Sequence, residues 1–343
     1  MHRNTQLGLA ILVAVLVASS VASALAADTV TVRTSGGSIV TRNGTVVDYT
    51  ASELRLRPAG GRDVVLPADQ IVRIEAARSA AHDQAETSFG KRAWREAAEQ
   101  FADAIRGEER PWVRREMLAR MVRCYRALGD GDSAGKVFLQ LVKSDATADQ
   151  FAAIPLAWQT VDPLVVSPQQ ARAWLDAVGD PAANLLGASH LLATTDADDA
   201  MAALQRLTSD RDLRIALLAD AQRWRTIRTA LDDAELARRQ RTVERIDASL
   251  RGGPYFALGQ SLLSAGKIDE AVAALLRVPI GHAQQRSLPA AALASAGSAL
   301  REAGRTDEAN VLFAELQRDY AEEADAVKRG VIRLPTPSEQ PRK

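Results

Sequence analysis

One pattern recurs along most of this chain and constrains its fold more than any other feature. In each copy a turn precedes an alanine, and an aromatic residue or a leucine follows that alanine four positions later. Ala97 and Ala134 are 37 positions apart, and Ala271 and Ala309 are 38 apart. The copies read KRAWREAAEQFADAI, LGDGDSAGKVFLQLV, SAGKIDEAVAALLRV and EAGRTDEANVLFAEL. Self-similarity at such a period indicates stacked copies of one supersecondary unit.

The pattern predicts tandem helical hairpins. In each hairpin a glycine ends the first helix, an Asp or a Thr-Asp pair caps the second, and the alanine lets the two helices approach closely. The aromatic residue or leucine then fills the groove between them. The residues expected to build the hairpins are Trp94, Ala97, Phe101, Ala104, Tyr125, Gly129, Ala134, Phe138, Gly259, Gly266, Ala271, Leu275, Gly297, Gly304, Ala309 and Phe313.

These residues resemble the tetratricopeptide repeat (TPR). The resemblance implies helix pairs stacked as a solenoid, whose concave face binds a peptide or a partner protein. The last two units match best. In the first two, Ala85 and Val122 replace the small residue expected early in the hairpin. The spacing also exceeds the period of about 34 residues that is usual for the family.

A short β-rich region comes before the helices. The runs DTVTVRT, GTVVDYT, SELRLRP and RDVVLPADQIVRIE alternate apolar and polar residues, and glycine-containing pairs at Gly36-Gly37, Asn43-Gly44 and Gly60-Gly61 separate them. This predicts four or five short strands forming a small sheet or barrel. Their order resembles small Sm-like or SH3-like barrels, which bind peptides or nucleic acids or merely pack on a neighbour. We therefore expect a mainly α fold, a solenoid of helical hairpins preceded by a small all-β, barrel-like module.

The predicted organisation has six parts. Residues 1–26 read as a secretory signal peptide, with an apolar run over 7–17 and the small residues Ala24-Leu25-Ala26 at the cleavage site, and imply export to the periplasm or the extracellular space. An uncleaved membrane anchor is the minor alternative. The β-module covers 27–78, TPR-like hairpins cover 79–147 and 253–330, degenerate hairpins cover 148–252, and 331–343 form a disordered tail.

The central region carries its own helix signals. Ser167-Pro168 and Asp180-Pro181 each place a capping residue before a proline, so helices are expected to start at Pro168 and Pro181. A longer helix is expected over roughly 233–250, halted by Gly252-Gly253-Pro254. Its ELARRQRTVER stretch reads as a solvated helix with pairs of opposite charge.

Charge and cysteine content narrow the possible partners. With 43 basic and 43 acidic residues the chain has no net attraction for nucleic acid, so none is expected as a partner. No membrane span is expected after cleavage of the signal. Cys124 is the only cysteine, so the fold cannot rest on disulfides, and its helical setting favours a buried thiol.

Catalytic motifs fail at the residues their chemistry requires. The stretch GDGDSAG lacks the hydroxyl of a phosphate loop, because Val137 stands in its place. It also lacks the glutamate of a calcium loop, where Leu141 stands. We therefore predict that GDGDSAG is a turn between two helices, with Asp130 or Asp132 as the cap of the second helix. GQSLL departs from a nucleophile elbow, and the histidines have no metal-ligand spacing. His190 is expected to be a packing residue. No catalytic residue, cofactor or metal is predicted.

The sequence leaves three functions open. The first is a non-enzymatic extracytoplasmic scaffold that binds a protein or peptide through the TPR-like surface, with Trp112 as a speculative contact residue. The second is an enzyme or accessory factor in cell-envelope glycan metabolism, which requires two carboxylates in one cleft with no capping or ion-pair role. The third gives the β-module the main role, with the helices as a dimerising arm.

Overall fold

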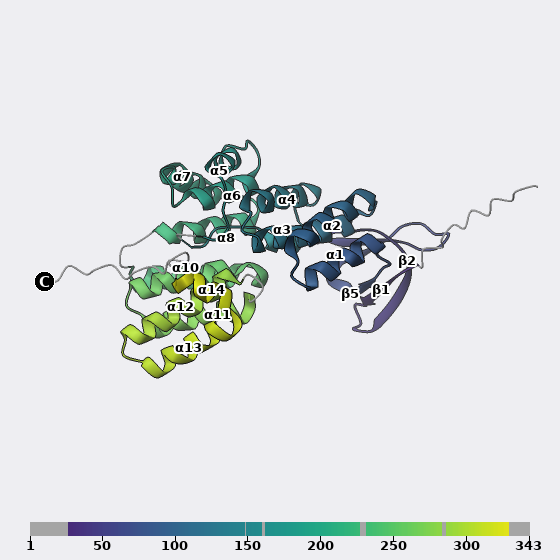
Figure 1. Ribbon diagram of the computed structural model, residues 1–343. Coiled ribbons are helices and arrows are strands. Elements are labelled where there is room, and N and C mark those ends of the chain that lie inside the picture. The colour runs from purple at the N-terminus through teal and green to yellow at the C-terminus, as the bar shows by residue number, and fades with distance from the viewer. Residues whose placement is uncertain (1–26, 148, 160–161, 227–230, 283–285, 329–343) are drawn as a thin grey trace, which may run out of the picture.

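The computed structural model describes residues 27–147, 149–159, 162–226, 231–282 and 286–328. The predicted signal peptide and the tail from residue 331 lie outside these described residues. Within them, a five-stranded antiparallel sheet precedes a long series of helices, as the sequence predicted at this coarse level. Figure 1 shows the sheet beside α1–α3, with α5–α8 lying over α10–α14 at the other end of the molecule.

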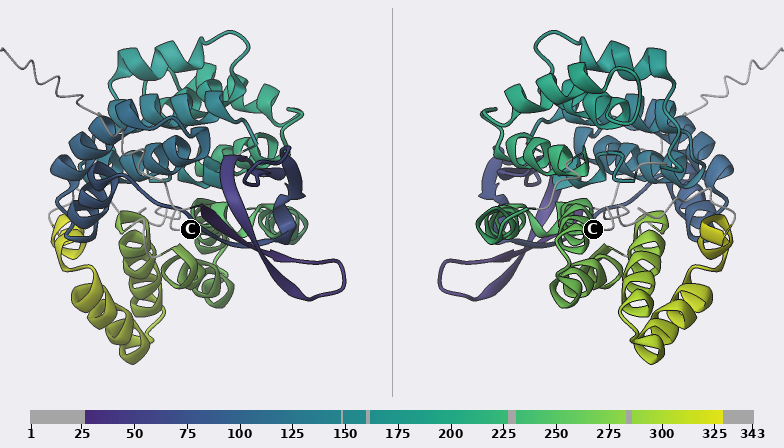
Figure 2. Two further views of the ribbon diagram at one scale, coloured as in Figure 1. Left: turned by 90° about the vertical axis from the view of Figure 1, so that its right-hand side faces the viewer. Right: turned by 90° about the vertical axis from the view of Figure 1, so that its left-hand side faces the viewer.

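The sheet has the strand order β4-β3-β2-β1-β5. The strands are β1 (Asp28–Arg33), β2 (Ile39–Tyr49), β3 (Glu53–Arg57), β4 (Val64–Pro67) and β5 (Ile71–Glu75), and the short 3-10 helix η1 (Ala68–Gln70) joins β4 to β5. β2 pairs with β1 through residues 39–44 and with β3 through residues 45–49. Figure 2 shows the β1–β2 hairpin projecting away from the helices.

The prediction of a turn at Asn43-Gly44 is wrong. Both residues lie inside β2, and the turn of this hairpin falls earlier, around Gly37, whose φ is +82°. Gly44 is needed for close approach instead, because a Cβ on it would lie 2.5 Å from the backbone oxygen of Arg57 on β3. A glycine inside a strand often marks such an approach of two backbones.

The helices follow the sheet along the chain. They are α1 (Ala80–Gly90), α2 (Trp94–Gly107), α3 (Pro111–Ala127), α4 (Gly131–Ser144), α5 (Pro168–Leu175), α6 (Pro181–Leu191), α7 (Ala197–Leu207), α8 (Leu213–Arg223), α9 (Asp233–Arg245), α10 (Gly252–Ser264), α11 (Ile268–His282), α12 (Ser287–Glu302), α13 (Thr306–Asp319) and α14 (Ala321–Lys328). Three further 3-10 helices are η2 (Asp149–Ala153), η3 (Trp224–Thr226) and η4 (Ala248–Leu250).

Glycine turns join several neighbouring helices, as predicted. Gly129, Gly266 and Gly304 follow α3, α10 and α12 with φ of +73°, +75° and +78°, the left-handed conformation that ends helices at low cost. Asp130 then caps α4, accepting a hydrogen bond from the Ser133 backbone nitrogen at 2.9 Å. The predicted Thr-Asp cap of α13 is wrong, because Thr306 is already helical and no side chain caps this end.

The helix starts in the central region agree with the prediction, but the long helix does not. Pro168 and Pro181 begin α5 and α6, capped by the side chains of Ser167 and Asp180. α9 ends at Arg245, and η4 completes the stretch that was expected to be one helix. Arg239 is not solvated as expected, since it is fully buried and donates to Ser261 Oγ at 2.7 Å.

The apolar side chains form two cores. The first joins the inner faces of the strands to α1, α2 and α3, and includes Val30, Leu54, Phe101 and Met117. The second runs from α3 and α4 to α14, and so includes residues of both predicted parts 148–252 and 253–330. Among the described helices, none has the length and apolar character needed to cross a membrane.

Candidate functional site

The residues predicted to build the hairpins are mostly packing residues. Ala97, Ala134, Ala271 and Ala309 are fully buried. A Cβ on Gly259 would lie 2.6 Å from Leu275 Cγ, and one on Gly297 would lie 2.9 Å from Phe313 Cε1. The helices therefore approach each other closely at the predicted glycines. Of the remaining members, Phe101, Ala104, Phe138 and Leu275 are buried, whereas Trp94, Tyr125 and Phe313 are half-buried.

Trp112 does not lie on a contact surface, and this proposed role is wrong. Its side chain is 2% exposed and packs in the first core. The indole nitrogen donates to the Val46 backbone oxygen at 3.2 Å, which ties α3 to β2. A buried tryptophan commonly meets its hydrogen-bond requirement in this way.

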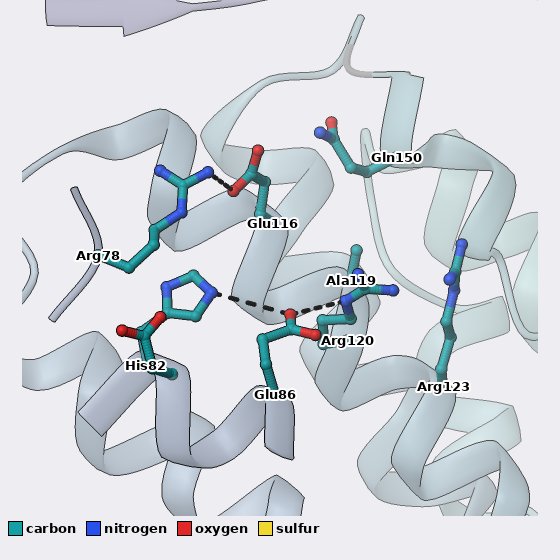
Figure 3. A pocket seen from close by; sticks show the side chains of 9 residues that line it. Arg78, His82, Glu86, Glu116, Ala119, Arg120, Arg123 and Gln150 are labelled. Carbon is teal, nitrogen blue, oxygen red and sulfur yellow. Dashed lines mark hydrogen bonds and ion pairs between the residues drawn. The ribbon is translucent and has the colours of Figure 1, made fainter. Parts of the chain in front are cut away.

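A hollow of about 410 Å³ lies beside the stacked pair of Arg78 and Trp112, and none of the predicted hairpin residues lines it. Figure 3 shows its lining, which comes from the connection before α1, from α1, from α3 and from η2. The lining residues are Arg78, His82, Asp83, Glu86, Glu116, Ala119, Arg120, Arg123 and Gln150. We call this site the α1/α3 hollow.

Arg78 enters the hollow from the connection between β5 and α1. Its Nη2 donates to Glu116 Oε2 at 2.8 Å, and its guanidinium stacks on the Trp112 ring at 4.6 Å from the centroid. Ser79, the next residue, caps α1 by accepting from the His82 backbone nitrogen, which fixes the direction of the helix. The Nη1 atom of Arg78 is buried and has no hydrogen-bond partner among the residues that the structure describes.

A second set of interacting side chains, His82, Glu86 and Arg120, links α1 to α3. His82 Nε2 lies 3.8 Å from Glu86 Oε1, and the same oxygen accepts from Arg120 Nε at 2.9 Å. The interaction with His82, with Arg120 adding to it, holds the pKa of Glu86 below its usual value. His82 is itself buried, with its ring edge-on to Phe101 at 6.0 Å between centroids.

The two glutamates of the hollow differ in their electrostatics. Burial raises the pKa of Glu116, and the positive charge of Arg78 opposes that shift only in part. Arg123 is exposed, and in the described part of the chain it makes no hydrogen bond or ion pair. Figure 3 shows Arg123 and Gln150 on the side of the hollow away from Arg78.

A sequence signal for this site existed but was missed. His82 and Glu86 are one turn apart, and Glu116, Arg120 and Arg123 follow the spacing of one helix face. The charge pattern of each helix was therefore visible. What brings the two faces together is the packing of α1 and α3 in the first core.

Residues 154–159 fill the space between several helices near this site. Ile154, Leu156 and Trp158 are buried, and Trp158 packs against α10, where a Cβ on Gly253 would lie 1.9 Å from its ring. The segment is also held through hydrogen bonds to its backbone. Nε2 of His190, which was predicted to be a packing residue, forms a hydrogen bond with the Pro155 backbone oxygen at 2.9 Å.

The two nucleophilic residues considered in the sequence, Cys124 and Ser261, are both buried in the structure. Burial raises the pKa of the Cys124 thiol to about 12, so it is not a thiolate at neutral pH. Ser261 of the GQSLL stretch is buried and donates to the Ala257 oxygen inside α10. Within the described ranges, no group of three or more His, Cys, Asp or Glu side chains is arranged to hold a metal ion.

Comparisons with protein-family models, with curated proteins and with solved structures find no match to this chain.

Proposed function

We propose that this protein is an exported scaffold that binds a protein or peptide partner through a TPR-like helical surface, with the α1/α3 hollow as its contact site. The observation that carries the proposal is an open hollow lined by hydrogen-bonding side chains, one of which, Arg123, makes no hydrogen bond or ion pair with the described residues. Export rests on the predicted signal at 1–26.

The helix pairs support the TPR-like part of the proposal. Left-handed glycines separate α3 from α4, α10 from α11 and α12 from α13, and small residues let the helices of these pairs approach. These are the features from which the repeat resemblance was drawn. A stack of such pairs presents an extended surface suited to a polypeptide.

In this proposal the β-module acts as a cap on the first hairpins. Its strand order and the 3-10 turn between β4 and β5 support a small Sm-like or SH3-like barrel. Its apolar face is buried together with α1–α3. Arg115 of α3 links the helices to the β-module. It donates hydrogen bonds to Asp48 Oδ1 at 2.6 Å and to the Tyr49 backbone oxygen at 2.8 Å.

Site-specific photocrosslinking in cells tests the proposal. A photoreactive amino acid replaces Ala119, which lines the hollow, and in a control variant it replaces Ala173, which is exposed on α5. We expect one protein to be captured reproducibly from position 119 and not from position 173. An identical capture pattern at both positions would contradict a role for the hollow.

One observation favours the enzymatic alternative in glycan metabolism. Glu86 and Glu116 line the same hollow, and their pKa values move in opposite directions, as in a pair of acid and base. Both glutamates, however, form ion pairs, Glu86 with Arg120 and Glu116 with Arg78. The enzymatic hypothesis required two carboxylates without an ion-pair role, so this requirement is not met. Release of soluble fragments from purified cell-wall glycan by the wild type, and its loss in Glu116→Gln, would favour this alternative.

A further inference from the structure

Residues 154–159 show how helices of this fold hold a segment without regular secondary structure through its backbone. Four side chains, from α3, α6, α8 and η3, form hydrogen bonds with the backbone oxygens of residues 154, 155, 157 and 159. The pairs are Arg126 Nη1 to Ile154 O at 3.1 Å, His190 Nε2 to Pro155 O at 2.9 Å, Gln222 Nε2 to Ala157 O at 3.0 Å and Arg225 Nη2 to Gln159 O at 2.9 Å. The segment is thus held through its backbone as well as through its buried side chains Ile154, Leu156 and Trp158.

The α1/α3 hollow lies at the start of this line of donors. On α3, Arg123 lines the hollow, and Arg126, one turn later, binds the Ile154 oxygen. On the other side, Gln150 of η2 lines the hollow just before the chain enters the 154–159 segment. The α1/α3 hollow is therefore open, and it lies next to the space that residues 154–159 fill.

Donors in the hollow resemble those along the filled stretch. Arg123 is exposed at the hollow and, within the described ranges, makes no hydrogen bond or ion pair. Its guanidinium is the same kind of donor as those of Arg126 and Arg225, which bind the Ile154 and Gln159 oxygens. A charged donor that gains an oxygen acceptor in this site strengthens binding.

The charge balance of the hollow decides which kind of oxygen fits. Three arginines, Arg78, Arg120 and Arg123, face three carboxylates, Asp83, Glu86 and Glu116, so the formal charges cancel. A ligand with several carboxylates meets as much repulsion as attraction here. Backbone carbonyl oxygens accept hydrogen bonds without bringing a net charge.

We propose that the hollow binds an extended, uncharged stretch of a partner polypeptide through its backbone carbonyl oxygens, in line with residues 154–159. This inference rests on the proposed scaffold function and specifies its ligand. The partner stretch is then selected for extension and for lack of charge.

The test uses two capped nine-residue peptides and the full chain. The first peptide has the sequence of residues 151–159, FAAIPLAWQ, and is uncharged. The second, FEEIPLEWQ, carries glutamate at its three alanines. Calorimetry gives the affinity, and side-chain NMR of ¹⁵N-labelled arginine shows which guanidinium groups are contacted.

We expect the uncharged peptide to bind and to shift the Arg123 signal. Its Kd should change less than about twofold between 50 and 500 mM salt, because screening acts on net charges. Arg123→Gln should weaken binding about tenfold, the loss of one hydrogen bond from a charged donor. Arg114→Gln is the matched control on the exposed side of α3 and should change nothing. Ala119→Trp, which fills the hollow, should abolish binding.

Two results would overturn the inference. If the glutamate peptide binds more than about tenfold tighter and loses affinity with salt, the hollow is a carboxylate site, and the scaffold function stands with a different ligand. If neither peptide binds to a chain with native circular dichroism, carbonyl recognition is wrong. Photocrosslinking from position 119 then decides separately whether the scaffold proposal also fails.

Discussion

At the residue scale, Arg92 is the only non-glycine residue of the described chain with a positive φ, at +60°. It lies in the turn between α1 and α2, where the corresponding turns after α3, α10 and α12 have glycine. The left-handed conformation costs a residue with a Cβ about 1–2 kcal/mol. We expect Arg92→Gly to raise the free energy of unfolding by about 0.5–1 kcal/mol, after allowing for the greater entropy of glycine in the unfolded chain.

Urea denaturation followed by circular dichroism measures this change. The control is Arg95→Gly, an exposed position inside α2, where glycine should lower the stability by about 1 kcal/mol. Equal stability losses in the two variants would show that the backbone at Arg92 is not strained.

Gly253 allows a contact that no other residue permits. A Cβ there would overlap the Trp158 ring at 1.9 Å, and Trp158 belongs to the second core. We expect Gly253→Ala to lower the free energy of unfolding by about 1–3 kcal/mol, as overpacking does. In the control, Gly107→Ala, a Cβ meets nothing within 4 Å, so stability should stay the same or rise. Thermal unfolding of both variants distinguishes the two effects, and a tolerated Gly253→Ala would mean that Trp158 lies elsewhere.

At the element scale, α3 holds the β-module through Arg115. The Arg115 side chain is 3% exposed and bonds to both Asp48 and the Tyr49 oxygen of β2. Arg115→Met keeps the side chain long but removes the guanidinium that donates to both acceptors. We expect it to lower the free energy of unfolding by about 3 kcal/mol, the usual result of breaking one side of a buried pair.

The neighbouring Arg114 provides the control for this change. It is exposed on α3, and Arg114→Met should change stability by less than about 0.5 kcal/mol. Guanidinium denaturation measures both variants. Similar small effects at the two positions would mean that the sheet is held by the apolar core alone.

Elements whose signals are local were the predictable ones. The turn glycines, the caps at Asp130, Ser167 and Asp180 and the buried alanines can be read from a few adjacent residues. Asn43-Gly44 misled the prediction because a glycine that serves a turn and one that serves a close approach look alike in sequence. The need for Gly44 comes from Arg57 on another strand.

The hollow and the buried Arg239 were missed for a related reason. Arg239 is stabilised by Ser261 and stacks on Trp224 at 5.3 Å, both of them distant along the chain. The hollow combines side chains from four separate segments. A helix face rich in charge looks the same in sequence whether it meets water or another charged face, so only the tertiary packing distinguishes the two.

At the scale of the whole molecule, the two cores meet on the same helices. Val122 of α3 belongs to the second core, while its neighbour Cys124 belongs to the first. α4 is divided in the same way, with Phe138 in the second core and Leu141 in the first. Neither core can lose its packing without exposing a helix that the other one uses. We therefore expect the described helices and the sheet to unfold in one cooperative transition.

Cys124 provides a probe of this coupling. It is fully buried, and burial raises its pKa to about 12, so a thiol reagent at pH 8 should not label the folded chain. With increasing urea, labelling should begin at the same midpoint as the loss of helical circular dichroism, because exposing Cys124 requires α3 to leave both cores. An Ala146→Cys variant, exposed after α4, should label at once and serves as the control for reagent activity. Labelling of Cys124 at a clearly lower urea concentration than the helical transition would show that the sheet and α1–α3 open on their own, and that the two cores are independent units.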